Sequence, residues 1–242
     1  MSAGDVRVVH RDAHLLVLFK PSRLPTTHPT GGDCLVARAA VIDPDAPHLH
    51  ATSRLDAEVT GMVTFARTKH ANDVLRAARR EHRYHRLYLA LTAHGGLDEP
   101  AVWDDAIGID PNDPRRRVIS TSPSAKGART RAVGRASAGP LSLLELRPET
   151  GRTHQLRVHA AQHGLALFGD VHYGGEKRAV LANGRVLTAR RTMLHCAALE
   201  LPDIAGDGRL DLRCEPPRDF ARSWSGAGGA PEALEPGPAQ PK

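Results

Sequence analysis

Residues 150–159 read Thr-Gly-Arg-Thr-His-Gln-Leu-Arg-Val-His, and earlier in the chain residues 53–61 read Ser-Arg-Leu-Asp-Ala-Glu-Val-Thr-Gly. The later segment predicts a glycine turn followed by a helix over residues 153–163, with Thr153 as its N-cap and Gly164 at its end. The earlier segment places the carboxylate of Asp56 just before a buried strand. Together, the two segments indicate an acidic residue that works beside an arginine-rich helix start.

Each segment also has a purely structural interpretation. Asp56 is a common type of residue for capping a turn, and a carboxylate can equally attack or deprotonate an activated carbon. Arg152, His154 and Arg157 are compatible with a solvated cationic face. A helix start beside guanidinium groups is also a natural receptor for phosphate or carboxylate.

The surrounding sequence predicts an α+β fold. Apolar runs and alternating patterns predict a strand or hairpin over 6–20 and strands over 62–66, 84–91, 141–146 and 193–201. Helices are expected over 32–42, 68–80 (capped by Thr68) and 153–163. Residues 95–140 are expected to form loops with short strands. Because these elements do not follow a βαβ order, α+β is the favoured class.

The predicted organisation is one catalytic domain over residues 1–222 and a disordered C-terminal tail over residues 223–242. From Ser223 the chain turns to Gly, Pro, Ala and Glu, a composition that buries little apolar surface. Length allows one large domain or two small ones with a real core.

Composition favours an RNA or DNA partner and a reducing compartment. The chain has 242 residues and a net charge of +6, which favours phosphate contacts although the excess is modest. Three distant cysteines predict neither a disulfide framework nor a zinc knuckle, which fits the cytoplasm. No apolar run reaches the ~18 residues of a membrane span, and residues 1–5 lack the apolar stretch of a signal peptide.

Other candidate residues remain open on sequence grounds. Tyr88 fits either a core tyrosine or a platform that stacks on a base. Arg115, Arg116 and Arg117 follow a turn sequence and fit either a solvated tip or a phosphate contact. The histidines of residues 154–163 lack the H-E-x-x-H pattern and an acidic neighbour, so no metal site is predicted.

Taken together, segments over residues 6–202 resemble the RluA-type pseudouridine synthase family. The family's H-R-L-D-x-x-T-S-G, K-x-Y-L-A-L, T-G-R-T-H-Q-I-R-V-H and G-D-x-x-Y-G motifs are similar to residues 53–61, 86–91, 150–159 and 169–174. Residues 12–21 resemble the family's D-x-H-L-L-V-x-N-K-P, and residues 194–196 its L-H-A. Departures from these motifs are Ser53 for the usual His, Phe19 for Asn, and Val59-Thr60 for Thr-Ser. They affect the expected fit around Arg54 rather than the reaction class.

The resemblance implies a cofactor-free and metal-free isomerase that converts uridines of structured rRNA or tRNA to pseudouridine. Asp56, Tyr88 and Arg157 are then the expected catalytic set, with Arg157 paired to Asp56 and Tyr88 stacked on the base. Arg54 is expected to fill the space that the flipped base leaves, and Arg152 and His154 to contact phosphate.

The resemblance also implies a pseudouridine synthase fold: a mixed, largely antiparallel sheet with a central cleft and outer helices. A monomer in the cytoplasm without a membrane partner is expected, and a fused S4-like RNA-binding module is expected to be absent. A non-catalytic RNA-binding or RNA-folding module is the alternative. A glycoside hydrolase is disfavoured, because it needs a second carboxyl and sugar-stacking aromatics, and the chain has only 2 Trp, 3 Tyr and 4 Phe.

Overall fold

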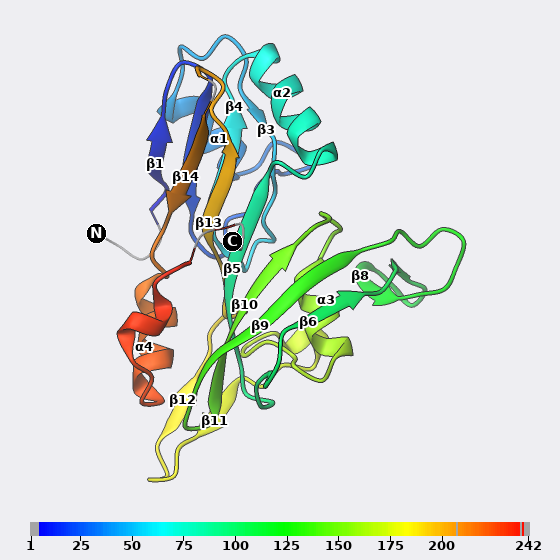
Figure 1. The fold of residues 1–242 in the computed structure, drawn as a ribbon, viewed down its shortest axis with the longest axis vertical. Helices are drawn as coiled ribbons and strands as arrows, with labels where there is room; N and C mark the ends of the chain where they lie inside the picture. Colours follow the sequence, from blue (N-terminus) through cyan, green and yellow to red (C-terminus); the bar gives the residue numbers. More distant parts are fainter. Residues whose placement is uncertain (1–4, 207, 238, 240–242) are drawn as a thin grey trace. The chain divides into compact units, whose positions relative to one another are not determined.

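The computed structural model describes residues 5–206, 208–237 and 239, and these form two compact units. The first unit comprises Met1–Leu87, His195–Pro217 and Pro236–Lys242, and the second comprises Tyr88–Leu194 and Arg218–Glu235. The described residues contain four α-helices and a large, mostly antiparallel sheet, which confirms the α+β prediction (Figure 1). The central cleft of that prediction remains an expectation.

The strands of the first unit form a continuous layer. β1 (Arg7–Arg11) and β2 (Leu15–Lys20) form an antiparallel hairpin, and β2 pairs antiparallel with β4 (Thr60–Ala66). β4 also pairs parallel with β13 (Leu194–Pro202). Only the first residue of β13, Leu194, belongs to the second unit. β14 (Arg209–Arg213) pairs antiparallel with β13, and the short β3 (His50–Ala51) pairs antiparallel with β4. Every residue of β2 and β4 is buried, including Lys20, Thr60 and Thr64, so both faces of these two strands are covered.

Two helices complete this unit, α1 (Leu35–Ile42) and α2 (Lys69–Arg80). Thr68 caps α2 as predicted, because its Oγ1 accepts a hydrogen bond from the backbone N–H of Ala71 at 3.0 Å. Helix α2 packs on β4 with Ala71, Leu75 and Ala78 buried. The expected hairpin, the 62–66 strand and both helices are therefore confirmed.

The second unit has its own antiparallel strand order, β5-β10-β9-β6. The bounds are β5 (His85–Thr92, which begins in the first unit), β6 (Ala101–Asp104), β9 (Arg129–Ala138) and β10 (Leu141–Pro148). The prediction of loops with short strands over 95–140 underestimates the strand content of this region, since β9 alone has ten residues. The sequence of β9 has few large apolar residues, so its strand comes from pairing along the apolar β10 rather than from its own propensity.

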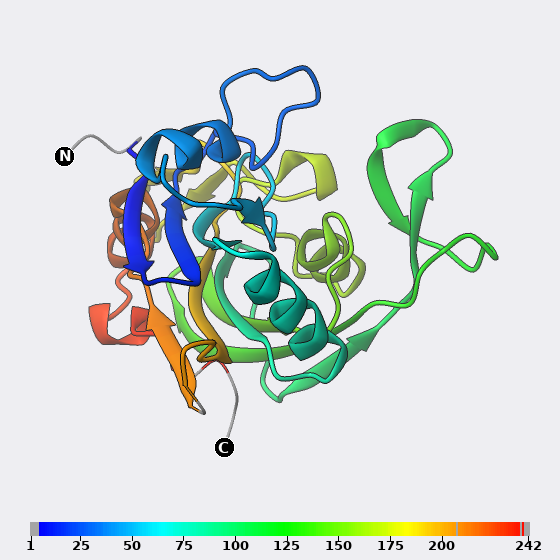
Figure 2. The ribbon, with the colours of Figure 1, turned by 90° about the horizontal axis from the view of Figure 1, so that it is seen from above.

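Two smaller hairpins belong to the second unit. β7 (Ile107–Asp110) pairs with β8 (Asp113–Ile119), and β11 (Arg178–Val180) pairs with β12 (Val186–Thr188). Each pair is a two-stranded sheet of its own. In Figure 2 the green segment that contains β7 and β8 stands out from the other strands of its unit.

Helix α3 (Gln155–Gln162) begins two residues later than predicted. Its N-cap is His154 in the left-handed conformation (φ 57°) without a side-chain cap, so the prediction of Thr153 as N-cap is wrong. The Gln155 side chain holds the preceding turn instead: its Oε1 accepts from the backbone N–H of Arg152 at 3.0 Å and from the Thr150 hydroxyl at 2.7 Å. The side-chain amide of Gln155 thus satisfies a backbone N–H before the helix, the function expected of Thr153.

The C-terminal region is structured where a disordered tail was predicted. It forms α4 (Arg218–Gly226) and the 3-10 helix η2 (Pro231–Leu234). Another 3-10 helix of the second unit, η1 (Val171–Tyr173), lies earlier in the chain. The side chain of Trp224 is 1% exposed, and its indole N–H donates to the Ala230 carbonyl at 2.8 Å. The prediction of disorder is therefore wrong for residues 223–237, because one buried indole outweighs a Gly- and Pro-rich composition. Its positions 238 and 240–242 lie outside the described residues.

No helix among the described residues is long and apolar enough to cross a membrane.

Candidate active site

Asp56 lies in the loop between β3 and β4, and the fully buried side chain of Lys20 donates a hydrogen bond to this loop. Lys20 is 0% exposed, and its Nζ donates to the carbonyl of Ala57 at 3.0 Å. Nζ also donates to the carbonyls of Pro21 at 2.9 Å and Leu24 at 2.7 Å. The ammonium is thus surrounded by carbonyl oxygens, which compensates part of its desolvation. The residue that follows Asp56 is fixed by this cluster.

The residue that precedes Asp56 is fixed by a threonine. The hydroxyl of Thr26 donates to the Leu55 carbonyl at 2.8 Å and accepts from the Leu55 N–H at 3.0 Å. Thr26 is 3% and Leu55 is 8% exposed, whereas Asp56 is half-buried. The backbone on both sides of the carboxylate is therefore held by buried polar contacts.

The glycine that closes the first motif permits a close approach of two strands. Gly61 has φ +121°, and a Cβ at this position would lie 2.4 Å from the carbonyl oxygen of Cys196 in β13. The neighbouring His195 is fully buried; its Nε2 lies 3.0 Å from the Cys214 carbonyl, and its Nδ1 lies 2.9 Å from the Thr60 hydroxyl. The carbonyl can only accept, so Nε2 is the donor, and in the neutral ring Nδ1 accepts from the Thr60 hydroxyl. The Leu-His-Cys motif thus supports the strand that follows Asp56.

Arg157 lies inside helix α3, and its side chain is held by a carboxylate. It is 5% exposed in α3, and its Nε and Nη2 donate to the two carboxylate oxygens of Asp170 at 2.6 and 2.7 Å. Asp170 is 1% exposed and follows Gly169, whose φ of +86° favours glycine. A bidentate pair of this kind fixes the plane of the guanidinium.

The sequence does not predict Asp170 as the partner of Arg157, although Asp170 belongs to the segment 169–174 that resembles a family motif. A buried arginine needs a carboxylate partner, and this aspartate in a glycine turn was the available signal. The predicted pairing of Arg157 with Asp56 joins residues of different units and stays a prediction.

The remaining predicted residues lie in different environments. Tyr88 is 5% exposed and stands opposite Leu146 in the β5–β10 pair. Arg54 and Arg152 are exposed, and Arg152 Nε donates to the Gly127 carbonyl at 2.9 Å. Their expected roles on the base and on phosphate stay predictions.

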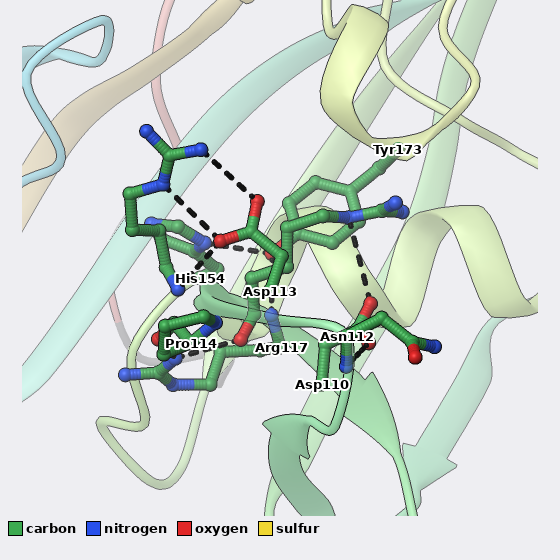
Figure 3. Close-up of polar contacts among 9 residues, drawn as sticks. Asp110, Asn112, Asp113, Pro114, Arg117, His154 and Tyr173 are labelled. Atoms are coloured by element: carbon green, nitrogen blue, oxygen red, sulfur yellow. Dashed lines mark hydrogen bonds and ion pairs between the residues drawn. The ribbon is translucent and has the colours of Figure 1, made fainter.

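His154, the other predicted phosphate ligand, contacts a tyrosine that sequence analysis did not select. Its Nδ1 lies 2.7 Å from the hydroxyl of Tyr173, and the two rings meet edge to face with centroids 5.7 Å apart. The same hydroxyl accepts a hydrogen bond from the backbone N–H of Arg117 in β8 at 3.0 Å (Figure 3). Tyr173 therefore connects the start of α3 with the β7–β8 hairpin.

The three consecutive arginines of that hairpin differ in their contacts. The Arg115 side chain is 89% exposed and forms an ion pair with Asp113 at 3.1 Å, and this hydrogen bond lowers the pKa of the Asp113 carboxyl. The Arg116 guanidinium lies 3.9 Å from the Asp110 carboxylate. Arg117 turns back on the hairpin, where its Nη1 donates to the carbonyls of Pro114 at 2.8 Å and Arg116 at 2.7 Å.

Across residues 5–206, 208–237 and 239, no group of three or more His, Cys, Asp or Glu side chains is arranged to hold a metal ion. The histidines considered above serve local contacts. His159 Nδ1 lies 3.0 Å from the Thr130 hydroxyl, and His163 Nε2 lies 2.8 Å from an Asp105 carboxylate oxygen.

Comparison with known proteins places these residues in a family. The family model of RNA pseudouridylate synthase matches residues 14–162. The chain is 30% identical to the uncharacterized RNA pseudouridine synthase YhcT of Bacillus subtilis, over 78% of this chain and 63% of that protein. It is 29% identical to the dual-specificity RNA pseudouridine synthase RluA of Yersinia pestis, over 86% of this chain and 98% of that protein.

Another relative is the ribosomal large subunit pseudouridine synthase D of Pseudomonas aeruginosa, which is 31% identical over 89% of this chain and 70% of that protein. The match to RNA pseudouridine synthase 2 of rice chloroplasts spans only 46% of that protein. Among solved structures, human RNA pseudouridylate synthase domain containing 1 superposes with a TM-score of 0.70 at 26% identity, covering 94% of this chain and 89% of that one. The family match covers most of the chain and includes both motif segments, so the chain belongs to the RNA pseudouridylate synthase family, and to its RluA type.

Proposed function

We propose that this chain is an RNA pseudouridine synthase that isomerises specific uridines in structured RNA without a cofactor. The observation that carries the proposal is the family match over residues 14–162, which contains Asp56, Tyr88 and Arg157. Because relatives are named for the large ribosomal subunit and for dual specificity, we infer that the substrate is ribosomal or transfer RNA.

The reaction rearranges the nucleoside and adds no atoms. The N1–C1′ bond breaks, the base turns, and a C5–C1′ bond forms, while C5 loses a proton and N1 gains one. A stacked uridine is not accessible to a side chain, so the nucleotide leaves the helix before reaction. Asp56 acts on the sugar or the base, either as a nucleophile on carbon or as a base that removes a sugar proton.

The other residues support this carboxylate. Tyr88 stacks on the target base and assists proton transfer, and Arg54 occupies the space that the base leaves. The Arg157 guanidinium is oriented by Asp170 through Nε and Nη2. In the proposed complex, this oriented cation pairs with Asp56 and keeps it ionised.

RNA binding depends on the basic surface. Arg152 and His154 contact phosphate beside the start of α3. The net charge of +6 favours this polyanionic partner. We propose a monomer that acts on RNA in the cytoplasm with no membrane partner.

The decisive experiment changes one carboxylate and keeps its neighbour as a control. Pseudouridines are mapped in total RNA from cells that lack this gene and carry the wild type, Asp56→Asn or Glu58→Gln. Asp56→Asn should abolish the modification, a loss at least as large as the about 10²–10⁴-fold of acid–base catalysis, while its RNA affinity stays within a few-fold. Glu58 is a half-buried carboxylate of the same loop, and Glu58→Gln should retain the modification.

Two results contradict the proposal. Turnover of Asp56→Asn near the wild-type rate would remove Asp56 from the mechanism. Full complementation of the cellular defect by Asp56→Asn, without any pseudouridine, would instead support the non-catalytic RNA-folding module.

A further inference from the structure

Tyr173 uses one hydroxyl to join two elements that are separate in the sequence. It is 9% exposed at the end of η1, and its Oη accepts from the backbone N–H of Arg117 in β8. Oη can also donate its own proton to Nδ1 of His154, which lies 2.7 Å away at the N-cap of α3. The hydroxyl thus forms a polar connection from the hairpin to the helix that carries Arg157.

The ring of Tyr173 makes a second connection at the same place. Tyr173 belongs to a buried cluster with Ile107 of β7 and Val158 of α3, against which Ile119 of β8 packs. The Arg157 guanidinium carbon lies 4.9 Å from the ring centroid, within the range of a cation–π contact. Removal of the hydroxyl alone would leave this apolar packing and the contact with Arg157.

The hairpin needs such an anchor because its strands form only a two-stranded sheet. Isolated two-stranded sheets are marginal in water, so contacts with the rest of the unit set its position. Outward residues are well exposed, including Ile109 at 62% and the Arg115 side chain at 89%. The Arg117 backbone lies opposite Ile109 in the hairpin, so a hydrogen bond at Arg117 acts on the middle of the pair.

Arg115, Arg116 and Arg117 have different contacts, and these contacts indicate two different roles. Arg117 donates to two carbonyls of its own hairpin and therefore stabilises the turn. Arg115 pairs with the Asp113 carboxylate at the surface. Arg116 lies 3.9 Å from the largely buried Asp110 carboxylate, and its guanidinium carbon lies 5.6 Å from the centroid of the Tyr173 ring. The Arg115–Asp113 pair is exposed and worth little, so an RNA phosphate can replace its carboxylate. The 3.9 Å separation of Arg116 from Asp110 is longer than a hydrogen bond, so Arg116 also keeps donors for a phosphate.

We propose that Tyr173 is a positioning residue that anchors the β7–β8 hairpin to α3 as an arm on which Arg115 and Arg116 bind RNA phosphates. The RNA partner in this inference rests on the proposed function. The Tyr173 hydroxyl fixes the position of the β7–β8 hairpin and thereby affects RNA affinity. The Tyr173 ring packs beside Arg157.

The experiment measures RNA affinity and the single-turnover rate at saturating RNA for Tyr173→Phe. A matched control is Tyr84→Phe in the first unit. Tyr84 is 7% exposed, its hydroxyl lies 2.9 Å from the Thr64 hydroxyl, and the Arg79 guanidinium lies 4.4 Å from its ring. Tyr173→Phe should weaken RNA binding about five- to tenfold, the effect of one lost hydrogen bond, with the saturated rate kept within about threefold. Tyr84→Phe should change neither quantity.

A second variant carries Arg115→Gln with Arg116→Gln and should weaken binding with a shallower salt dependence. If Tyr173 acts through these arginines, adding Tyr173→Phe to this variant weakens binding no further. Melting temperatures of all variants separate a general loss of folding from a loss of affinity.

The inference is overturned if Tyr173→Phe matches Tyr84→Phe, if the two changes add independently, or if the arginine variant binds like the wild type. A wild-type protein that binds RNA but forms no pseudouridine would contradict the proposed function alone. The affinity comparison would still decide the role of Tyr173 in that case.

Discussion

The two charged residues that the proposed mechanism brings together are held in opposite ways in their own units. Around Asp56, the fixed contacts fall on the backbone of the loop, through Lys20 to Ala57 and through Thr26 to Leu55. Around Arg157, the contact falls on the side chain itself, through the bidentate pair with Asp170.

This difference suits two different tasks. A buried carboxylate partner fixes the direction of the Arg157 guanidinium, because two parallel hydrogen bonds define a plane. A fixed backbone on both sides presents the half-buried Asp56 side chain at one place in the loop. Substitutions beside Arg157 should therefore affect stability and orientation together, whereas those beside Asp56 should shift the loop.

The largest effect on stability is expected at Asp170. Asp170→Asn removes the charge of the carboxylate that pairs with the buried Arg157 guanidinium and should lower the free energy of unfolding by about 3–5 kcal/mol, as for other broken buried pairs. Urea denaturation measures this loss. The control is Asp33→Asn, because Asp33 also forms a bidentate pair with Arg38 but at the surface, and it should leave stability unchanged. Equal losses for the two variants would show that burial does not distinguish the pairs.

The next largest effect compares two arginines at the start of α3. Arg157→Lys keeps a charge but loses the planar fork, so turnover at saturating RNA should fall by about 10²-fold, the effect of one lost catalytic hydrogen-bond donor. RNA affinity should fall much less, because Arg157 is only 5% exposed.

Arg152→Lys should behave in the opposite way. Arg152 is exposed, so its replacement should weaken RNA binding and reduce its salt dependence while saturated turnover is nearly kept. Single-turnover kinetics and filter binding separate the two variants. If both lose affinity alone, Arg157 is a phosphate ligand and its pairing with Asp56 is wrong.

A smaller effect is expected at the loop of Asp56. Lys20→Met keeps the apolar stem but leaves the carbonyls of Pro21, Leu24 and Ala57 without their shared donor. The Ala57 carbonyl still accepts from the backbone N–H of Arg23 at 2.8 Å, so the loss falls on the buried Pro21 and Leu24. It should cost about 1–3 kcal/mol of stability, less than the change at Asp170. Turnover at saturating RNA should fall while RNA affinity is kept, since Lys20 is fully buried. A selective loss of affinity would place the lysine cluster in RNA binding instead.

The sequence allowed prediction of elements whose signal is local. The Thr68 cap and the buried run before Ala66 specify α2 and β4 within their own residues, and both lie where they were expected. Helix α4 could not be predicted from composition, because burial of Trp224 depends on residues such as Ala230 that fold back on it. Strand β9 likewise depends on its partner β10.

In the candidate site, too, local motifs could be predicted from the sequence, whereas contacts between distant residues could not. Asp56, Tyr88 and Arg157 were selected by motif, which needs no knowledge of contacts. Asp170 was missed because its importance comes from a buried contact with Arg157 thirteen positions earlier. Tyr173 was missed because a tyrosine in a glycine-rich turn has no local pattern that indicates two hydrogen-bonding partners.

The smallest expected effect concerns pH and the helix that carries Arg157. His159 is fully buried in α3, and burial lowers the pKa of its imidazole below the ordinary value. Nε2 lies 3.2 Å from the Asp105 carbonyl, which can only accept, so the neutral ring donates there and its Nδ1 accepts from Thr130. Below the ordinary histidine pKa of about 6.5, the unfolded chain binds a proton that the folded chain does not. The stability contributed by the neutral ring is thus complete above that pH and falls as the pH drops below it.

Melting temperatures between pH 7.5 and pH 5 test this directly. The wild type should lose more stability on acidification than His159→Gln, which replaces the ring with a side chain that does not titrate. The control is His70→Gln, which removes an exposed histidine of α2 and should keep the wild-type pH dependence. His159 and Arg157 belong to the same short helix, α3. If this helix sets the orientation of the guanidinium, turnover at saturating RNA should fall over the same pH range as stability. Equal pH profiles for the wild type and His159→Gln would show that acid acts on the Asp56 unit or on the RNA contacts instead.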